Sequence, residues 1–213
     1  MRIAIFGATG QTGRQLVEQA LERGYSVTAF ARDPRGLSDV ARLVTVVQGD
    51  VLQPERVAAA VRGQDAVLYA VGVRRGTPPG TLLSSGTRAV VDAMRAHGVR
   101  RLIVQTGIVS SQSRSRMGPV SRLLATLFRL RQPELYRDKD RQEQIVQASG
   151  LAWTIVRPPL LVRGPRSGGA YRAGADFAPR LPSRVRYADV AEFMLRQLDD
   201  DRLVGRAAAI VAR

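Results

Sequence analysis

With 213 residues, 45% of them apolar, the chain can bury one sizeable core, and we expect a single domain over residues 1–213. The absence of cysteine fits a cytoplasmic protein, and together with a single histidine it leaves no expected metal site. The net charge of +15 comes almost wholly from arginine, since Lys139 is the only lysine among 33 basic residues. We attribute the charge to surface composition and expect no nucleic acid partner, although such a field attracts polyanions.

Short apolar runs alternate along the chain with segments of helical spacing. The runs, many of them β-branched, predict buried strands at 3–6, 27–30, 43–47, 66–71, 102–104 and 152–156. The helical segments are 11–23, 54–62, 81–97 and 134–149, and three of them end at glycine. Strand and helix in alternation predict an α/β protein with the Rossmann fold, a doubly wound, mostly parallel sheet with helices on both faces.

Two irregular segments, 110–120 and 162–184, follow predicted strands and are rich in Gly, Pro, Ser and Arg, and the substrate-rim segments that we expect there are about 110–131 and 162–184. Ligands of an open parallel sheet bind beyond the carboxyl ends of its strands. Both segments are therefore candidates for the substrate rim, and a plain disordered loop is the alternative for the first.

A glycine-rich loop follows the first strand and opens the first helix, which is the arrangement of a dinucleotide site. Gly7 permits a tight turn, Gly10 lets backbone amides approach a pyrophosphate, and Gly13 allows close packing of helix on strand. The free N–H groups and partial positive charge of the helix amino terminus favour phosphate there. The predicted contacts of this loop are Gly7, Thr9, Gly10, Gln11, Thr12 and Gly13.

The second strand ends beside Arg32, with Asp33 and Arg35 close behind. Arginine matches a 2′-phosphate in charge and in forked geometry, whereas an acidic residue would accept hydrogen bonds from the ribose hydroxyls of NAD. Arg32, assisted by Arg35, therefore favours NADP(H) as cofactor. Asp33 leaves some use of NAD(H) open.

The spacing of three residues between successive glycines resembles the atypical short-chain dehydrogenase/reductase superfamily. This resemblance implies an adenine contact after the third strand and a ribose and pyrophosphate wall after the fourth. It also implies that Lys139 orients the nicotinamide ribose and that Thr106 and Pro158 shape the nicotinamide pocket. The further cofactor residues so implied are Asp50, Val51, Ala70, Val71, Gly72, Arg74, Thr106, Lys139, Pro158, Pro159 and Leu160.

Stretches beyond the loop resemble biliverdin-IXβ reductases, also called flavin reductases: 3–13, 24–25, 32–33, 49–53, 63–67 and 94–99, then 149–151, 158–159, 169–171 and 193–195. The later half, with Lys139, Glu143 and 153–158, also resembles NmrA-like NAD(P)-binding proteins. The first likeness implies hydride transfer from NADPH to a conjugated acceptor, such as a flavin, tetrapyrrole or quinone. Gly107 and Leu160 replace a serine and a histidine of those reductases, so the acceptor pocket is expected to differ.

The usual proton donor of short-chain dehydrogenases is a tyrosine four residues before the lysine, and here Leu135 stands in that position. Tyr136 is one residue closer, which on a helix turns it by about 100°. We therefore expect Lys139 and Thr106 as the catalytic residues and no tyrosine acid. The alternative function is a non-catalytic NADP(H) sensor of the NmrA type.

The basic segment 114–131 includes Leu123, Leu124, Leu127, Phe128 and Leu130. Such a pattern is typical of a helix that faces the core and keeps its arginines outside, and contact with a membrane or partner is the alternative. No apolar run reaches the roughly 18 residues of a membrane span, and no signal peptide is apparent, so we expect no membrane partner. The sequence makes no prediction of oligomeric state.

Overall fold

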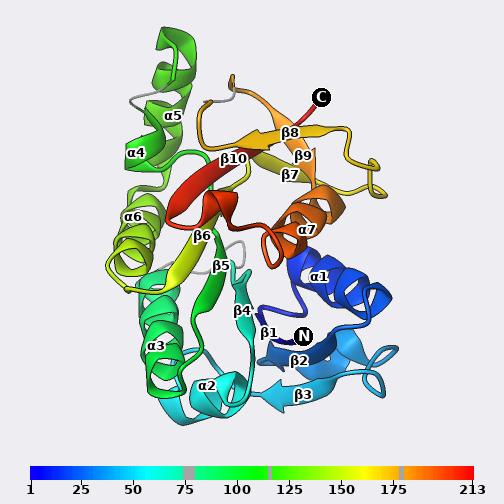
Figure 1. Cartoon of the computed structure of the whole chain (residues 1–213). Coiled ribbons are helices and arrows are strands. Elements are labelled where there is room, and N and C mark those ends of the chain that lie inside the picture. The colour runs from blue at the N-terminus through cyan, green and yellow to red at the C-terminus, as the bar shows by residue number, and fades with distance from the viewer. Residues whose placement is uncertain (74–79, 115–116, 178–179) are drawn as a thin grey trace.

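An eight-stranded sheet forms the centre of the protein in the computed structural model, which describes residues 1–73, 80–114, 117–177 and 180–213 (Figure 1). The strand order is β3-β2-β1-β4-β5-β6-β10-β8, and every pair is parallel except β10 with β8. The order reverses between β1 and β4, which creates the crevice where ligands of such sheets bind. The strands are β1 (Arg2–Phe6), β2 (Ser26–Ala31), β3 (Thr45–Gln48), β4 (Ala66–Tyr69), β5 (Arg101–Gln105), β6 (Ala152–Arg157), β8 (Tyr171–Gly174) and β10 (Arg206–Ala212).

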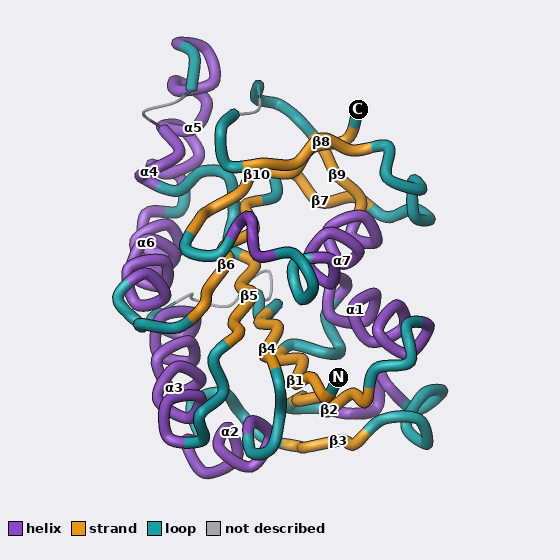
Figure 2. The backbone as a smooth tube through the Cα atoms, viewed as in Figure 1, coloured by secondary structure: helices purple, strands orange, loops and turns teal. Residues whose placement is uncertain are grey.

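Helices cover both faces of the sheet (Figure 2). On one face α1 (Gln11–Glu22) packs against α7 (Tyr187–Arg196) over a core that includes Leu16, Val190 and Met194. On the other, α3 (Leu82–Ala96) lies between α2 (Pro54–Val61) and α6 (Pro133–Gln147) over a core that includes Val57 and Val90. The predicted α/β Rossmann fold with a doubly wound, mostly parallel sheet is therefore confirmed.

The structure adds elements that the sequence analysis did not predict. They are α7, β8, β10, a separate parallel pair formed by β7 (Leu160–Val162) and β9 (Arg184–Arg186), and the short helices η1 (Pro34–Leu37), α4 (Ser111–Arg114) and η2 (Asp201–Leu203). Strand β4 also ends at Tyr69, before the predicted residue 71. The two residues that follow Tyr69, Ala70 and Val71, therefore lie beyond the carboxyl end of the strand, where they can line a cavity.

Helix α5 (Pro119–Arg131) contradicts the prediction of a core-facing helix with its arginines outside. Its buried residues are Ser121 and Ala125, which are small, whereas most of its large apolar side chains are exposed. Arg129 turns inward instead, donating to the Val109 carbonyl at 3.2 Å and pairing with Asp140 at 2.6 Å. The helix thus rests on the body of the protein through two small residues, the partly buried Leu124 and one arginine. It protrudes at the top of Figure 1.

Candidate functional site

The glycine loop forms a cradle that side chains cannot enter. Gly7 has φ of +80°, and a Cβ atom there would lie 2.7 Å from the Ala70 carbonyl oxygen. A Cβ on Gly13 would overlap the Gly7 carbonyl, so helix α1 begins directly against the loop. A Cβ on Gly10 would make a less severe contact, at 3.2 Å from the Gly7 carbonyl oxygen. Gly7 and Gly13 are therefore required by packing, whereas Gly10 keeps the backbone open to the cavity.

The amino terminus of α1 is suited to an anion. Gly10 is its N-cap and provides no side-chain cap, and the first turn contains no acidic residue. The first N–H groups of a helix have no partner within the helix and carry a partial positive charge. Because the residues of this turn, Gln11 and Thr12, line a cavity, these groups fit the pyrophosphate of a dinucleotide.

Two adjoining cavities open along the carboxyl edge of the sheet. The first, which we name the Arg32 lobe, holds ≈ 430 Å³ and lies over the ends of β1 and β2. The second, the Lys139 lobe, holds ≈ 710 Å³ and extends to β5, β6 and α6. Because they share five lining residues, Thr9, Gly10, Ala70, Val71 and Gly72, they form one elongated groove beside the glycine loop.

The Arg32 lobe places one arginine and one carboxylate at its wall. Arg32 and Asp33 both line it, and the nearest ion-pair partner of Arg32 is Asp50, at 3.9 Å. Arg35 is not among the lining residues, because its guanidinium pairs with the Asp33 carboxylate at 2.6 Å. Hydrogen bonds from Arg35 lower the pKa of the Asp33 carboxyl to about 2. Asp33 is therefore ionised, with its charge balanced from outside the cavity.

Lys139 and Thr106 meet at the far end of the groove. The partly buried Lys139 Nζ donates to the Thr106 carbonyl oxygen at 3.3 Å. Burial lowers the pKa of Lys139, and the nearby Glu143 opposes that shift. A Cβ on Gly107 would stand 3.0 Å from Lys139 Nζ. Gly107, which stands where the similar biliverdin-IXβ reductases have a serine, thus leaves room for the lysine ammonium.

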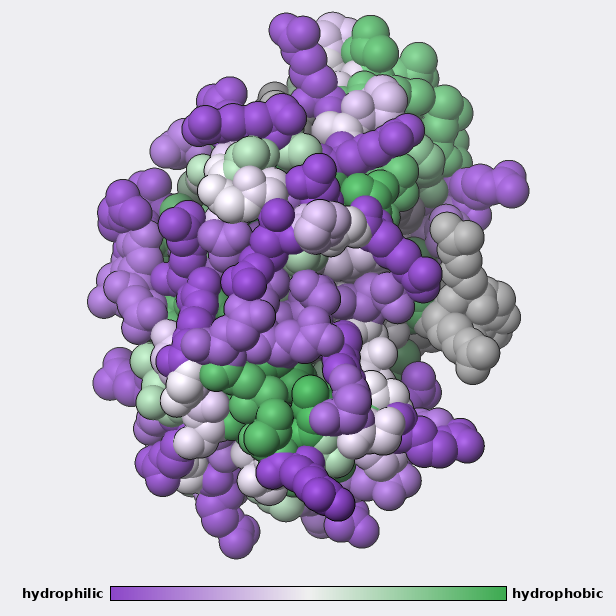
Figure 3. Space-filling view, turned by 90° about the vertical axis from the view of Figure 1, so that its right-hand side faces the viewer, coloured by the Kyte–Doolittle hydropathy of each residue, from purple (hydrophilic) through white to green (hydrophobic). Residues whose placement is uncertain are grey.

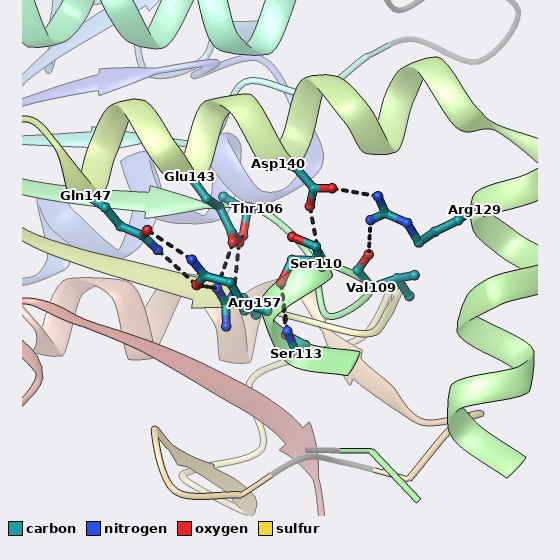
Figure 4. Close-up of polar contacts among 11 residues, drawn as sticks. Thr106, Val109, Ser110, Ser113, Arg129, Asp140, Glu143, Gln147 and Arg157 are labelled. Atoms are coloured by element: carbon teal, nitrogen blue, oxygen red, sulfur yellow. Dashed lines mark hydrogen bonds and ion pairs between the residues drawn. The ribbon is translucent and has the colours of Figure 1, made fainter. Parts of the chain in front are cut away.

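The hydroxyl of Thr106 faces away from the lobe, into a buried network drawn in Figure 4. Its Oγ1 donates to Glu143 Oε1 at 2.7 Å, and Arg157 donates to both oxygens of Glu143, at 2.9 and 2.6 Å. The Arg157 and Glu143 side chains are only 9% and 3% exposed. The network ties β5, β6 and α6 together behind the cavity, so Thr106 offers the lobe its backbone rather than its hydroxyl.

Helix α6 is also anchored to α3. The buried Asp138 carboxylate accepts hydrogen bonds from the backbone N–H groups of Leu83 at 2.8 Å and Ser84 at 3.2 Å. Gln142, one turn on, donates to Thr87 Oγ1 at 3.1 Å. Asp138 thereby satisfies free N–H groups at the start of α3. The position of Lys139 is thus set by the residues on either side of it along α6.

Leu135 and two tyrosines near Lys139 differ in whether they line the Lys139 lobe. Leu135 lines the Lys139 lobe, whereas Tyr136 is not among its lining residues and packs with a small apolar cluster that includes Ile108 and Val109. The Tyr136 ring lies 5.9 Å from Lys139 Nζ, and burial raises the pKa of its hydroxyl. Tyr187, at the start of α7, lines the lobe instead.

Most of the predicted site residues line the groove, and four do not. Gly13 packs beneath the loop, Asp50 stands behind Arg32, and Arg35 pairs with Asp33. Leu160 is exposed and is not among the lining residues, whereas its neighbour Leu161 lines the lobe, because successive residues of strand β7 face opposite sides. The predicted contact Arg74 lies outside the described residues.

Sequence reasoning missed several lining residues: Val73, Leu83, Gln105, Leu161, Gln142 and Tyr187. Gln105 ends β5, and its buried Oε1 has no hydrogen-bond partner among the described residues, so it can accept one from a ligand. Gln142 was within reach of sequence reasoning, since it lies about one helical turn after Lys139. Nothing in the local sequence marks Tyr187, which the pairing of β7 with β9 brings to the groove.

Comparison with known proteins gives the same cofactor class. Residues 7–201 match the model of the NAD(P)H-binding family. The Arabidopsis thaliana chloroplastic protein At2g34460 is 32% identical over 184 residues, which are 82% of this chain and 64% of that protein. The 3-diazoavenalumate denitrifying reductase of a Streptomyces species is 32% identical over 230 residues, covering 99% of this chain and 72% of that protein.

A solved structure shares the fold. ChuY, an anaerobilin reductase of Escherichia coli O157:H7, superimposes with a TM-score of 0.82 at 23% identity, over 100% of this chain and 97% of that one. At this identity the likeness concerns the fold alone. The family match, which spans nearly the whole sequence, is the stronger finding. The chain therefore belongs to the NAD(P)H-binding family, and its cofactor is NAD(P)H.

Proposed function

We propose that this protein is an NADPH-dependent reductase that transfers hydride to a flavin or another conjugated acceptor. This proposal rests mainly on which titratable side chains line the Lys139 lobe. Its described lining includes no Asp, Glu or His, and its titratable side chains are Lys139 and Tyr187. Leu135 occupies the lobe where a proton-donating tyrosine would support ketone reduction. The groove thus offers a cofactor site and a roomy second site with few acids.

An acceptor with a conjugated ring system suits such a lobe. It delocalises the arriving negative charge, so a solvent proton can complete the reduction without a placed protein acid. NADPH, when bound, supplies the hydride, and one proton from water balances the two-electron reduction of the acceptor. The protein then contributes mainly by holding the two rings at about 3 to 3.5 Å, where proximity alone lowers the barrier substantially.

Named residues take distinct parts in this proposal. The α1 amino terminus and Gly10 receive the pyrophosphate, and Arg32 receives the 2′-phosphate. Lys139, held at the Thr106 carbonyl, donates hydrogen bonds to the nicotinamide ribose. Thr106 and Pro158 form the wall against which the nicotinamide lies. The name of the Streptomyces relative, a reductase, supports this assignment.

NADPH oxidation tests the proposal. The purified protein is given FMN, FAD, a quinone or biliverdin, with a panel of simple ketones as control acceptors. We expect turnover with at least one conjugated acceptor and little with ketones. The Lys139→Met variant should raise the KM for NADPH. Tight NADPH binding without reduction of any conjugated acceptor would contradict the proposal and indicate a non-catalytic redox sensor of the NmrA type.

A further inference from the structure

Helix α5 carries an exposed apolar stripe that the cofactor site does not use. Its members, Val120, Leu123, Leu127 and Leu130, are spaced by three, four and three residues, so they lie along one side of the helix. They are between 52% and 72% exposed. Phe128, also exposed, flanks them. Apolar side chains in such a row, left in water, mark an interaction surface.

The stretch of sequence that carries this stripe is positively charged. The sequence contains no acidic residue between Asp92 and Glu134, and α5 itself contributes three arginines. Arg129 is held inward by Asp140. Arg122 and Arg131 are exposed, and Arg131 lies beside the stripe by helical spacing, whereas Arg122 donates to the Met117 carbonyl at 3.2 Å. The helix therefore combines apolar side chains with cationic ones and carries no acid to attract a second cationic surface.

The stripe is also accessible. Few residues of α5 pack on the body of the protein, and it is the uppermost element of Figure 1. In the space-filling view, turned about the vertical axis, hydrophobic side chains gather at the same height, at the top of the molecule (Figure 3). The end of α5 therefore extends beyond the other labelled elements in the view of Figure 1.

We propose that α5 docks this protein onto an anionic membrane surface. A basic amphipathic helix lies in the plane of such an interface, with its apolar side chains at the acyl boundary and its arginines among lipid phosphates. Thirteen residues span only about 20 Å at 1.5 Å per residue, which suits a surface position. No described helix is long and apolar enough to cross the bilayer.

A second copy of this chain fits the stripe less well. Pairing two α5 helices along the stripe would bring Arg131 of both copies near the contact, with no acid on either helix. Each chain, moreover, carries a net charge of +15. Anionic lipid complements that charge, whereas a second copy repeats it.

Vesicle sedimentation tests the proposal with the full chain. We expect at least tenfold tighter binding to phosphatidylcholine vesicles containing phosphatidylglycerol than to phosphatidylcholine alone, and weaker binding as salt rises. The double variant Leu123→Ser/Leu127→Ser should lose at least tenfold of the binding. Leu43→Ser, which removes an equally exposed leucine far from α5 in the sequence, is the matched control and should bind as the parent does.

NADPH affinity, measured in every variant, reports folding independently of lipid binding. Equal partition onto both vesicle types, or undiminished binding by the double variant, would overturn the proposal. So would a dimeric parent that Leu123→Ser converts to a monomer, because the second copy would then be the occupant. The test is independent of acceptor turnover, so its failure leaves the proposed reductase function intact.

Discussion

Replacing Arg32 with alanine is expected to remove most of a preference for NADPH over NADH. Arg32 lines the groove, its side chain is 64% exposed, and its nearest acid, Asp50, stands at 3.9 Å, so the guanidinium is free to bind a phosphate. A hydrogen bond to a charged group contributes roughly 1.5 to 3 kcal/mol. Because most of the side chain is in water, we take the lower limit. It corresponds to about a tenfold loss of NADPH affinity.

Calorimetric titration with both dinucleotides measures this loss, and NADH affinity should not change. Arg35→Ala is the informative companion, because Arg35 acts through Asp33. Without Arg35 the Asp33 carboxylate is unbalanced at the cavity wall and repels a 2′-phosphate, so NADPH affinity should fall by less than in Arg32→Ala. Adding Asp33→Asn should restore it. Equal parental affinities for NADPH and NADH, or no loss in Arg32→Ala, would refute the reasoning.

Three further outcomes follow from the site. Gly10→Val should abolish dinucleotide binding in a protein whose circular dichroism is unchanged, and retained NADPH affinity would remove the loop from the cofactor site. Tyr136→Phe and Tyr187→Phe should each leave flavin reduction within a few-fold of the parent. A loss of about 10²- to 10⁴-fold in either, with cofactor affinity intact, would reveal a protein acid. Glu143→Gln breaks the buried pair with Arg157, so it should cost about 3 kcal/mol. This lowers Tm by roughly 6 to 12 °C in a melting experiment, and an unchanged Tm would contradict a structural role for the pair.

The cofactor half of the fold could be predicted because its signals are local. The strand before Gly7 and the helix after it are adjacent in sequence, and the glycines mark where the backbone turns sharply. The register of Leu135 and Tyr136 against Lys139 was equally local, since helical spacing alone decides which of them shares the lysine's face.

The remaining elements of the fold depend on contacts with segments that are distant in sequence. Strand β10, rich in alanine, is defined by pairing with β6 on one side and β8 on the other. Tyr187 reaches the groove only because β9 pairs with β7. For α5 the pattern identified an amphipathic helix but not its orientation, because two small residues and Leu124, rather than its other leucines, make the contact with the body.

The anchoring of α6 has a consequence for motion. Within one and a half turns this helix fastens the start of α3 through Asp138, the Thr106 carbonyl through Lys139, and the Thr106 hydroxyl through Glu143. These bonds join three elements into one cooperative unit, so local opening of α6 exposes amides of α3 and of the segment after β5 to hydrogen exchange together. The glycine loop and α1 lie outside this unit. An opened molecule can thus retain the pyrophosphate site that we propose at the glycine loop while the Lys139 lobe is lost.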